Sequence, residues 1–124
     1  MKLLDTGAWI EYFKGTDKGK KIREIIGSED VCTSIISFAE IARWIIQNDL
    51  DLSLAVQQVE CNAIVIDLDR ETLVESGAVY PALRKKRNKI GMIDVIIYVA
   101  AIKNNLTLMT GDRDLVGLPG VEAL

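Results

Sequence analysis

The sequence predicts a three-layer α/β/α fold in which helices cover both faces of a central, mostly parallel sheet. Short apolar runs of strand length alternate along the chain with longer segments whose apolar residues recur at helical spacing, a pattern typical of βαβ units. Residues 63–66 are continuously apolar, as in a parallel strand that is buried on both faces. No linker, repeat or low-complexity segment interrupts the alternation, so residues 1–124 are predicted to form one domain.

The first half of the chain begins with a short buried strand that ends in an acid, and helices follow it. In order, the predicted elements are a strand over 2–5, a helix from Thr6 through Phe13, a helix over 16–26 stopped by Gly27, a strand over 31–33, a helix from Ser37 through Ile45 and a helix over 52–59.

The second half repeats the alternation with longer helices. Asp69 is suited to cap a helix whose apolar positions include Leu73, Ala78 and Leu83. In order, the predicted elements are a buried strand over 63–66, this long helix, a helix after Gly91 that carries Asp94, a buried strand over 106–109 and an edge strand around Val121.

The composition is that of a globular protein, with 49% hydrophobic and 27% charged residues. The net charge of −3 provides no general attraction to nucleic acid, so such a partner would need a local basic patch. The most apolar stretch, residues 90–101, is interrupted by Asp94 and is shorter than the roughly 20 residues of a membrane span. The chain opens without a signal-peptide pattern, and we expect a cytoplasmic protein that does not contact a membrane.

Histidine is absent, and this absence excludes several kinds of active site. Ser-His-Asp and Cys-His machinery and imidazole acid–base catalysis are impossible, and a zinc site would lack its usual ligands. Cys32 and Cys61 have no metal-ligand spacing and are predicted to be buried free thiols. Carboxylates, lysines, hydroxyls and hard metal ions remain as the available chemistry.

Four acids from distant segments are predicted to meet at one edge of the sheet. Asp5 ends the first strand, and Asp112 follows the strand over 106–109. Both therefore belong at the carboxyl ends of parallel strands, where sites of open α/β sheets lie. Glu40 and Asp94 fall near the starts of two helices that can face the same crevice. Clustered carboxylates without a cation would repel each other, so divalent metal ions are their natural partners.

Most of these acids also have a purely structural explanation. Residues 37–40 match a capping box, in which Glu40 would close onto the backbone of the cap residue. Asp94 is equally explained as a first-turn acid that the helix dipole favours. Asp112 and Asp114 lie in a turn, where aspartate often accepts hydrogen bonds from its own backbone. Asp5 has no such alternative, because a strand-end acid after two leucines has no predicted cap to form.

The chain resembles the PIN-domain family, and within it the small VapC-type toxins of prokaryotic toxin–antitoxin pairs. The resemblance covers essentially the whole chain, which implies a PIN-like fold. It rests on four motifs in order, Leu4-Asp5-Thr6-Gly7, Ser37-Phe38-Ala39-Glu40-Ile41, Ile93-Asp94-Val95-Ile96-Ile97-Tyr98-Val99-Ala100-Ala101 and Met109-Thr110-Gly111-Asp112-Arg113-Asp114-Leu115.

The resemblance implies a metal-dependent endoribonuclease that uses Mg²⁺ or Mn²⁺ and cleaves RNA. It also implies a small antitoxin as partner and a homodimer. The family commonly has a glycine before the strand over 106–109, and Asn104 or Asn105 is expected to take the left-handed conformation in its place. The residues that match the family's functional positions are Asp5, Glu40, Asp94 and Asp112 as catalytic metal-site acids, Asp114 as an outer metal ligand, and Thr6 and Thr110 as hydroxyls that support metal, water or phosphate.

A basic segment over residues 84–89 directly precedes the helix that carries Asp94. Cations at a helix end are favoured by the dipole without any ligand. The functional interpretation is a phosphate-contacting patch, in which Arg84 and Arg87 bind RNA beside the acids. The lysines near the start of the second helix (Lys14, Lys18, Lys20 and Lys21) form a second, weaker candidate patch.

Three other functions compete with the nuclease. One is a non-catalytic PIN-like module that binds RNA or protein. Another is a receiver-like signalling domain, which also uses acids and Mg²⁺ at strand ends but usually pairs adjacent acids near its first strand. The third is a nucleotide-binding domain, although residues 19–21 lack the spacing and the Ser or Thr of a phosphate loop.

Overall fold

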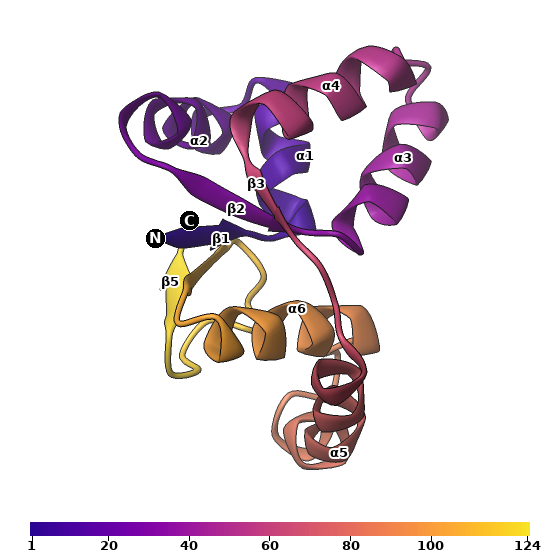
Figure 1. Cartoon of the computed structure of the whole chain (residues 1–124), viewed down its shortest axis with the longest axis vertical. Coiled ribbons are helices and arrows are strands. Elements are labelled where there is room, and N and C mark those ends of the chain that lie inside the picture. Colours follow the sequence, from indigo (N-terminus) through magenta and orange to yellow (C-terminus); the bar gives the residue numbers. More distant parts are fainter.

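The computed structural model describes all 124 residues and contains six helices and five strands (Figure 1). The strands are β1 (Lys2–Leu4), β2 (Val31–Ser34), β3 (Ile64–Ile66), β4 (Thr107–Thr110) and β5 (Val121–Ala123). The helices are α1 (Thr6–Lys14), α2 (Asp17–Ser28), α3 (Ser37–Gln47), α4 (Leu52–Asn62), α5 (Arg70–Lys86) and α6 (Met92–Lys103).

The five strands form one parallel sheet in the order β3-β2-β1-β4-β5. The central strand β1 pairs with both β2 and β4, so that Leu4 lies opposite Thr33 on one side and Met109 on the other. From β1 the chain order proceeds through β2 and β3 in one direction and through β4 and β5 in the other. The carboxyl ends of β1 and β4 therefore border a topological switch point, where sites of such sheets lie.

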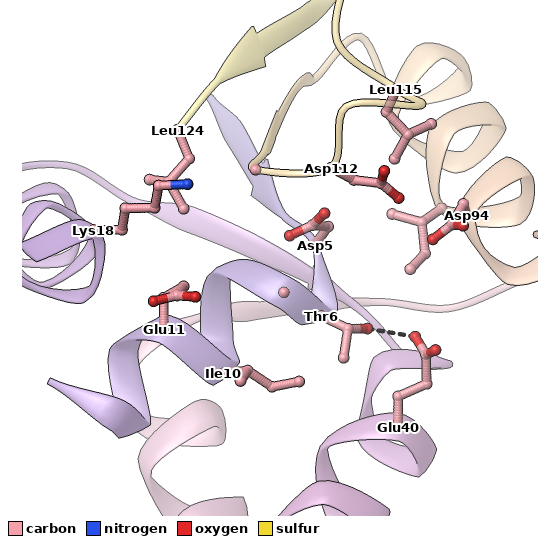
Figure 2. Close-up of a pocket in the computed structure, with 13 residues that line it drawn as sticks. Asp5, Thr6, Ile10, Glu11, Lys18, Glu40, Asp94, Asp112, Leu115 and Leu124 are labelled. Atoms are coloured by element: carbon pink, nitrogen blue, oxygen red, sulfur yellow. Dashed lines mark hydrogen bonds between the residues drawn. The ribbon is translucent and has the colours of Figure 1, made fainter. Parts of the chain in front are cut away.

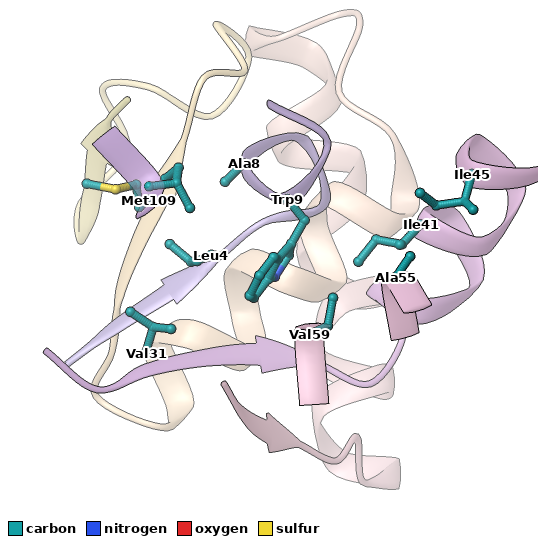
Figure 3. Packing of buried hydrophobic residues seen from close by; sticks show 10 residues of the cluster. Leu4, Ala8, Trp9, Val31, Ile41, Ile45, Ala55, Val59 and Met109 are labelled. Atoms are coloured by element: carbon teal, nitrogen blue, oxygen red, sulfur yellow. The ribbon is translucent and has the colours of Figure 1, made fainter. Parts of the chain in front are cut away.

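The helices divide between the two faces of the sheet, which confirms the predicted three layers. Figure 1 shows α1 to α4 on one face and α6 on the other, with α5 packed outside α6. Alternate residues of β1 serve the two cores: Leu4 packs with α1, α3 and α4, and Leu3 packs with α6. Figure 3 shows Trp9 in the middle of the first core, and its indole N–H donates to Thr33 Oγ1 at 3.1 Å.

Local predictions about helix ends are largely confirmed. The Asp69 side chain accepts a hydrogen bond from the backbone N–H of Thr72 at 2.8 Å and so caps α5 as predicted. Asn105 has a φ of 55° and takes the left-handed conformation before β4. The second helix, however, does not stop at Gly27 but continues to Ser28. Gly27 faces open space, so neither crowding nor a turn ends the helix there.

Two predictions of burial, those for Ile64 and Cys61, are wrong, and two apolar positions of α5 are also exposed. Ile64 is 50% exposed, because β3 is an edge strand and not a strand in the middle of the sheet. Leu73 is 45% exposed and Ala78 is also exposed, since α5 contacts little besides α6 and turns the short side chains of Thr72 and Ser76 inward. Of the two cysteines, Cys32 is buried as predicted whereas Cys61 on α4 is exposed. No helix of the structure combines the length and apolar character that a membrane span requires.

Candidate active site

A pocket of about 370 Å³ lies at the carboxyl ends of β1 and β4, beside the first turns of α1, α3 and α6 (Figure 2). Four of the acids singled out in the sequence line this pocket. Its lining consists of Asp5, Thr6, Gly7, Ile10, Glu11, Lys18, Glu40, Asp94, Ile97, Gly111, Asp112, Leu115 and Leu124.

Asp5 is the most buried of the acids, with 7% of its surface exposed. It caps α1 by accepting a hydrogen bond from the backbone N–H of Ala8 at 2.7 Å, and its other oxygen accepts one from the Thr110 hydroxyl. The pKa of Asp5 is raised from 3.8 to about 6, mainly by burial and additionally by the charges of Asp94 and Asp112, although the hydrogen bonds from Thr110 and Ala8 lower it. Asp5 is therefore fixed in orientation and is costly to ionise.

Glu40 reaches the pocket because the predicted capping box does not form. The residue before α3 is Ile36, which makes no side-chain cap, and Ser37 lies inside the helix. The Glu40 carboxylate instead accepts a hydrogen bond from the Thr6 hydroxyl at 2.6 Å, which ties α3 to the start of α1. Figure 2 shows this contact at the edge of the pocket. The contact leaves the rest of the carboxylate available to a ligand.

Asp94 has a structural role at the start of α6 and also lines the pocket. Its Oδ2 accepts a hydrogen bond from the backbone N–H of Gly91 at 3.0 Å, so it does act as a first-turn acid of α6. It also lines the pocket and is partly buried. Burial raises the pKa of Asp94, and the charges of Asp112, Glu40 and Asp114 raise it further, while the Gly91 hydrogen bond lowers it.

The turn after β4 is held by its own polar groups. The backbone N–H of Asp112 donates to Thr110 Oγ1 at 3.0 Å, and Asp112 Oδ1 accepts from the backbone N–H of Asp114 at 2.9 Å. Asp112 lines the pocket, whereas Asp114 does not. Thr110 thus connects the Asp112 turn to the carboxylate of Asp5. The charge of Asp114 raises the pKa of Asp94 without a direct contact between the two side chains.

The two arginines predicted to contact RNA do not line this pocket. Arg84 donates to the backbone oxygen of Ile90 at 2.9 Å. Arg87 donates to the backbone oxygens of Asp114 at 3.0 Å and Val116 at 2.7 Å. Each guanidinium group therefore secures the chain around α5 and the Asp112 turn, and its remaining N–H groups are free to bind another partner.

Two charged residues of the pocket wall were not assigned to the site from sequence. Glu11 was not singled out, although it follows Gly7 by four residues and so lies on the same side of α1. Lys18 belonged only to the weaker of the two candidate basic patches. Its position became clear only from the packing of α2 beside α1, which brings the start of α2 to the pocket.

The donors in this pocket suit a hard divalent cation such as Mg²⁺ or Mn²⁺, because all of them are oxygen atoms. None of Asp5, Glu40, Asp94, Asp112 and Asp114 forms an ion pair with a lysine or arginine. In the present side-chain conformations no three acids are close enough together to hold one ion. Binding of one ion by three of these acids would therefore require side-chain rotations toward a common point.

The fold and the site together define a parallel α/β domain with an acidic pocket at the point where its strand order reverses. The family profile of the PIN domain matches residues 2–120, and the chain belongs to this family, as its four motifs predicted. This membership contradicts the receiver-like and nucleotide-binding alternatives. Gly19, the first residue of the candidate phosphate loop, lies inside α2.

Solved structures of toxin–antitoxin proteins have a similar fold. A toxin–antitoxin complex from Klebsiella pneumoniae contains a chain that is 22% identical, with a TM-score of 0.74 and coverage of 98% of this chain and 96% of that one. VapBC2 from Rickettsia felis, bound to a promoter DNA fragment, contains a chain with 19% identity, a TM-score of 0.76 and coverage of 99% and 98%. VapC20 of Mycobacterium tuberculosis, a Sarcin-Ricin loop cleaving toxin, has 14% identity, a TM-score of 0.76 and coverage of 98% and 99%. No curated protein sequence matched the chain.

Proposed function

We propose that this protein is a metal-dependent endoribonuclease and the toxin of a type II toxin–antitoxin pair. The observation that carries the proposal is the meeting of Asp5, Glu40, Asp94 and Asp112 in one pocket with no cation paired to any of them. Membership of the PIN domain family supports it, and so does the likeness in fold to a toxin described as cleaving the Sarcin-Ricin loop.

Asp5, Asp94 and Asp112 would hold one or two Mg²⁺ or Mn²⁺ ions, with Asp114 as an outer ligand. A bound divalent ion lowers the pKa of an attacking water and neutralises charge that develops on the phosphodiester. Thr110 keeps the Asp5 carboxylate in one orientation through its hydrogen bond.

Glu40 is suited to accept a proton from the attacking water, because the Thr6 hydroxyl holds one of its oxygens at 2.6 Å. Thr6 also lines the pocket, and its hydroxyl could donate to a phosphate oxygen only in place of Glu40, because it has a single proton to donate. Attack by water would leave a 5′-phosphate and a 3′-hydroxyl. RNA ends that carry a 2′,3′-cyclic phosphate would contradict this mechanism.

The proposed partners follow from the same likeness. The solved complexes with a similar fold include antitoxin-bound proteins, and we extend that arrangement to this chain as a small antitoxin partner. A homodimer is likewise proposed. Co-purification of a small second protein expressed from the same operon, together with the mass of the complex by light scattering, would test both.

The deciding experiment compares RNA cleavage by the wild type and by Asp94→Asn, with Mg²⁺, with Mn²⁺ and with EDTA. We expect metal-dependent cleavage that falls at least a hundredfold in Asp94→Asn, since one metal ligand loses its charge. The matched control is Glu71→Gln, which removes a first-turn acid of α5 outside the pocket. Equal cleavage by wild type and Asp94→Asn would refute the proposal.

The second candidate is a non-catalytic PIN module that binds RNA or protein. It is favoured by one observation, namely that no three acids converge closely enough to hold an ion in this conformation. RNA binding without cleavage under either metal would support this candidate instead.

A further inference from the structure

Lys18 is the one positively charged side chain that lines the acidic pocket. Figure 2 shows it reaching from the start of α2 toward the side of the pocket that the Asp112 turn forms. Its Nζ lies 3.7 Å from the position that a Cβ on Gly111 would occupy. The ammonium group therefore stands over the turn that carries Asp112.

This ammonium group is not used to neutralise the acids. Lys18 forms no ion pair, although it shares the pocket with Glu11 and the four proposed metal-site acids. Glu11, which also lines the pocket, accepts a short hydrogen bond of 2.5 Å from the Thr16 hydroxyl instead. Lys18 is also exposed to solvent. A free cation at the rim of a pocket of acids is available to an anionic group of a ligand.

The first turn of α2 is built to hold Lys18 at this rim. Thr16 caps the helix by accepting from the backbone N–H of Gly19 at 3.1 Å while its hydroxyl donates to Glu11 of α1. A Cβ on Gly19 would lie 2.0 Å from the backbone oxygen of Glu11, so only glycine permits the two helices to approach this closely. The backbone position of Lys18 is thus fixed by the packing of α2 on α1, while its long side chain can still change conformation.

We propose that Lys18 binds a phosphate group of the RNA backbone, namely one that is adjacent to the phosphate at which the RNA is cleaved. This inference rests on the proposed ribonuclease function and extends it to a substrate-binding residue. The acids repel a polyanion, and a lysine at the rim offsets that repulsion where the strand enters. Because Lys18 contacts a neighbouring phosphate and not the reacting atoms, it acts on RNA binding and leaves the chemical step unchanged.

The test measures cleavage kinetics and the salt dependence of binding with one labelled single-stranded RNA. Cleavage is followed with Mg²⁺ for the wild type, Lys18→Gln, Lys18→Arg and the matched control Lys21→Gln. Lys21 belonged to the same candidate patch in the sequence, but in the structure it lies outside the pocket, exposed on the same helix and without an ion pair, so it is not part of the proposed phosphate contact. Binding is followed by fluorescence anisotropy over a series of KCl concentrations, with Asp94→Asn added to each variant to prevent cleavage.

We expect Lys18→Gln to raise KM roughly fivefold and to change kcat less than about twofold, the scale of one exposed ionic contact. For this variant, the slope of the logarithm of the RNA-binding constant against the logarithm of the salt concentration should be shallower by about 0.7, which is the slope that one phosphate contact contributes on a single strand. Lys18→Arg should retain the wild-type KM and slope, and Lys21→Gln should match the wild type.

Equal KM and equal slope for Lys18→Gln and Lys21→Gln would overturn the inference. A fall in kcat at unchanged KM would overturn it as well, because the lysine would then act on the chemical step or on the fold. A wild type that does not cleave RNA under either metal would overturn the proposed function. In that case the binding slopes still decide whether Lys18 contacts the nucleic acid.

Discussion

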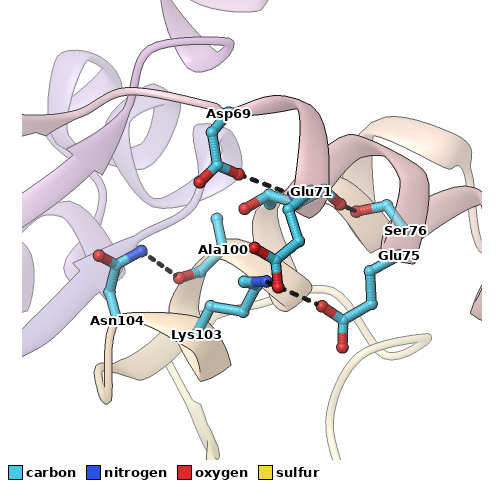
Figure 4. Close-up of polar contacts among 8 residues, drawn as sticks. Asp69, Glu71, Glu75, Ser76, Ala100, Lys103 and Asn104 are labelled. Atoms are coloured by element: carbon cyan, nitrogen blue, oxygen red, sulfur yellow. Dashed lines mark hydrogen bonds and ion pairs between the residues drawn. The ribbon is translucent and has the colours of Figure 1, made fainter.

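Two groups of charged side chains in this protein differ in how their charges are compensated. In the acidic pocket, burial and mutual repulsion raise the pKa values of Asp5 and Asp94, so ionisation is opposed. Between α5 and α6, Lys103 Nζ lies 2.9 Å from Glu71 Oε1 and 3.2 Å from Glu75 Oε2 (Figure 4). There the hydrogen bond to Glu71 and the neighbouring charges raise the pKa of Lys103, so ionisation is favoured.

The difference separates a structural charge cluster from a functional one. Lys103 and the two glutamates join the outermost helix to α6, and this cluster needs nothing from outside the protein. The pocket acids oppose one another's ionisation and have no cation of their own, which is how sites that await a ligand are recognised. Repulsion among the acids lowers the free energy of unfolding, and binding of a cation would raise it again.

The largest expected effect is a simultaneous gain in stability and loss of activity in Asp5→Asn. Asparagine is as good a helix cap as aspartate and can still accept from Ala8. Its amide nitrogen cannot accept from the Thr110 hydroxyl, so the loss of that hydrogen bond offsets part of the gain. Removing the charge relieves a penalty of up to about 3 kcal/mol at pH 7, which follows from a pKa raised from 3.8 to about 6. RNA cleavage should fall about a thousandfold. Urea unfolding and cleavage rates test the two halves, and a destabilised variant would contradict the assigned cost.

The second prediction concerns how stability without metal depends on pH. Because Asp5 has a folded-state pKa above its unfolded value, the folded state binds its proton more tightly between about pH 4 and pH 6. This contribution to the free energy of unfolding is fully present below that window and is lost as the pH rises through it. Asp94 acts in the same direction, since its pKa is also raised.

Urea unfolding of the wild type in EDTA at pH 4.5 and pH 7, compared with Asp5→Asn at the same two pH values, isolates this contribution. We expect the wild type to lose about 2 kcal/mol more than the variant over the range, from the pKa of about 6. Added Mg²⁺ should reduce the loss, because a cation favours the ionised acids. Parallel pH profiles for the two proteins would show that Asp5 ionises in the folded state without cost.

The third prediction tests the basic segment at the end of α5, where Arg87 contacts the backbone of the turn that carries Asp112 and Asp114. Arg84→Gln combined with Arg87→Gln should weaken RNA binding roughly tenfold and make its salt dependence shallower by about 1.4, if each contacts one phosphate. Stability should also fall, because the arginines donate to three backbone oxygens, those of Ile90, Asp114 and Val116. The control Lys85→Gln removes an exposed charge of the same helix. Lower stability with an unchanged salt slope would limit both arginines to a structural role.

The sequence predicted what depends on local pattern. The strands, the helix after Asp69 and the left-handed Asn105 follow from short-range preferences for burial, capping and turns. The convergence of Asp5 and Asp112 was also predictable, because carboxyl ends of parallel strands meet at one edge. The exposure of Ile64 was not predictable, because an apolar run does not indicate whether its strand lies at the edge or in the middle of the sheet.

The parts of the site that sequence missed depend on how the layers pack. Residues 37–40 match a capping box in sequence, but Glu40 faces Thr6 because α3 packs beside the start of α1. From the sequence, Arg84 was predicted to contact RNA, and Lys18 belonged only to the weaker of the two candidate basic patches. The packing of α2 on α1 brings Lys18 to the pocket, whereas Arg84 is turned toward the backbone of its own loop. Such choices are made by tertiary contacts that no local spacing encodes.

The smallest expected effect is that of Lys103→Met, which removes the cation from the compensated cluster. Methionine keeps the unbranched aliphatic length of the lysine side chain, so the change isolates the charge. The two glutamates are 81% and 50% exposed, and water replaces much of what they lose. We expect the Tm to fall by less than about 4 °C, with the difference reduced at high salt and RNA cleavage unchanged. The control Lys85→Met changes an exposed lysine of α5 that forms no ion pair, and its Tm should equal that of the wild type. A loss of cleavage in Lys103→Met would mean that the α5–α6 junction controls the pocket, and the two charge groups would then belong to one functional unit.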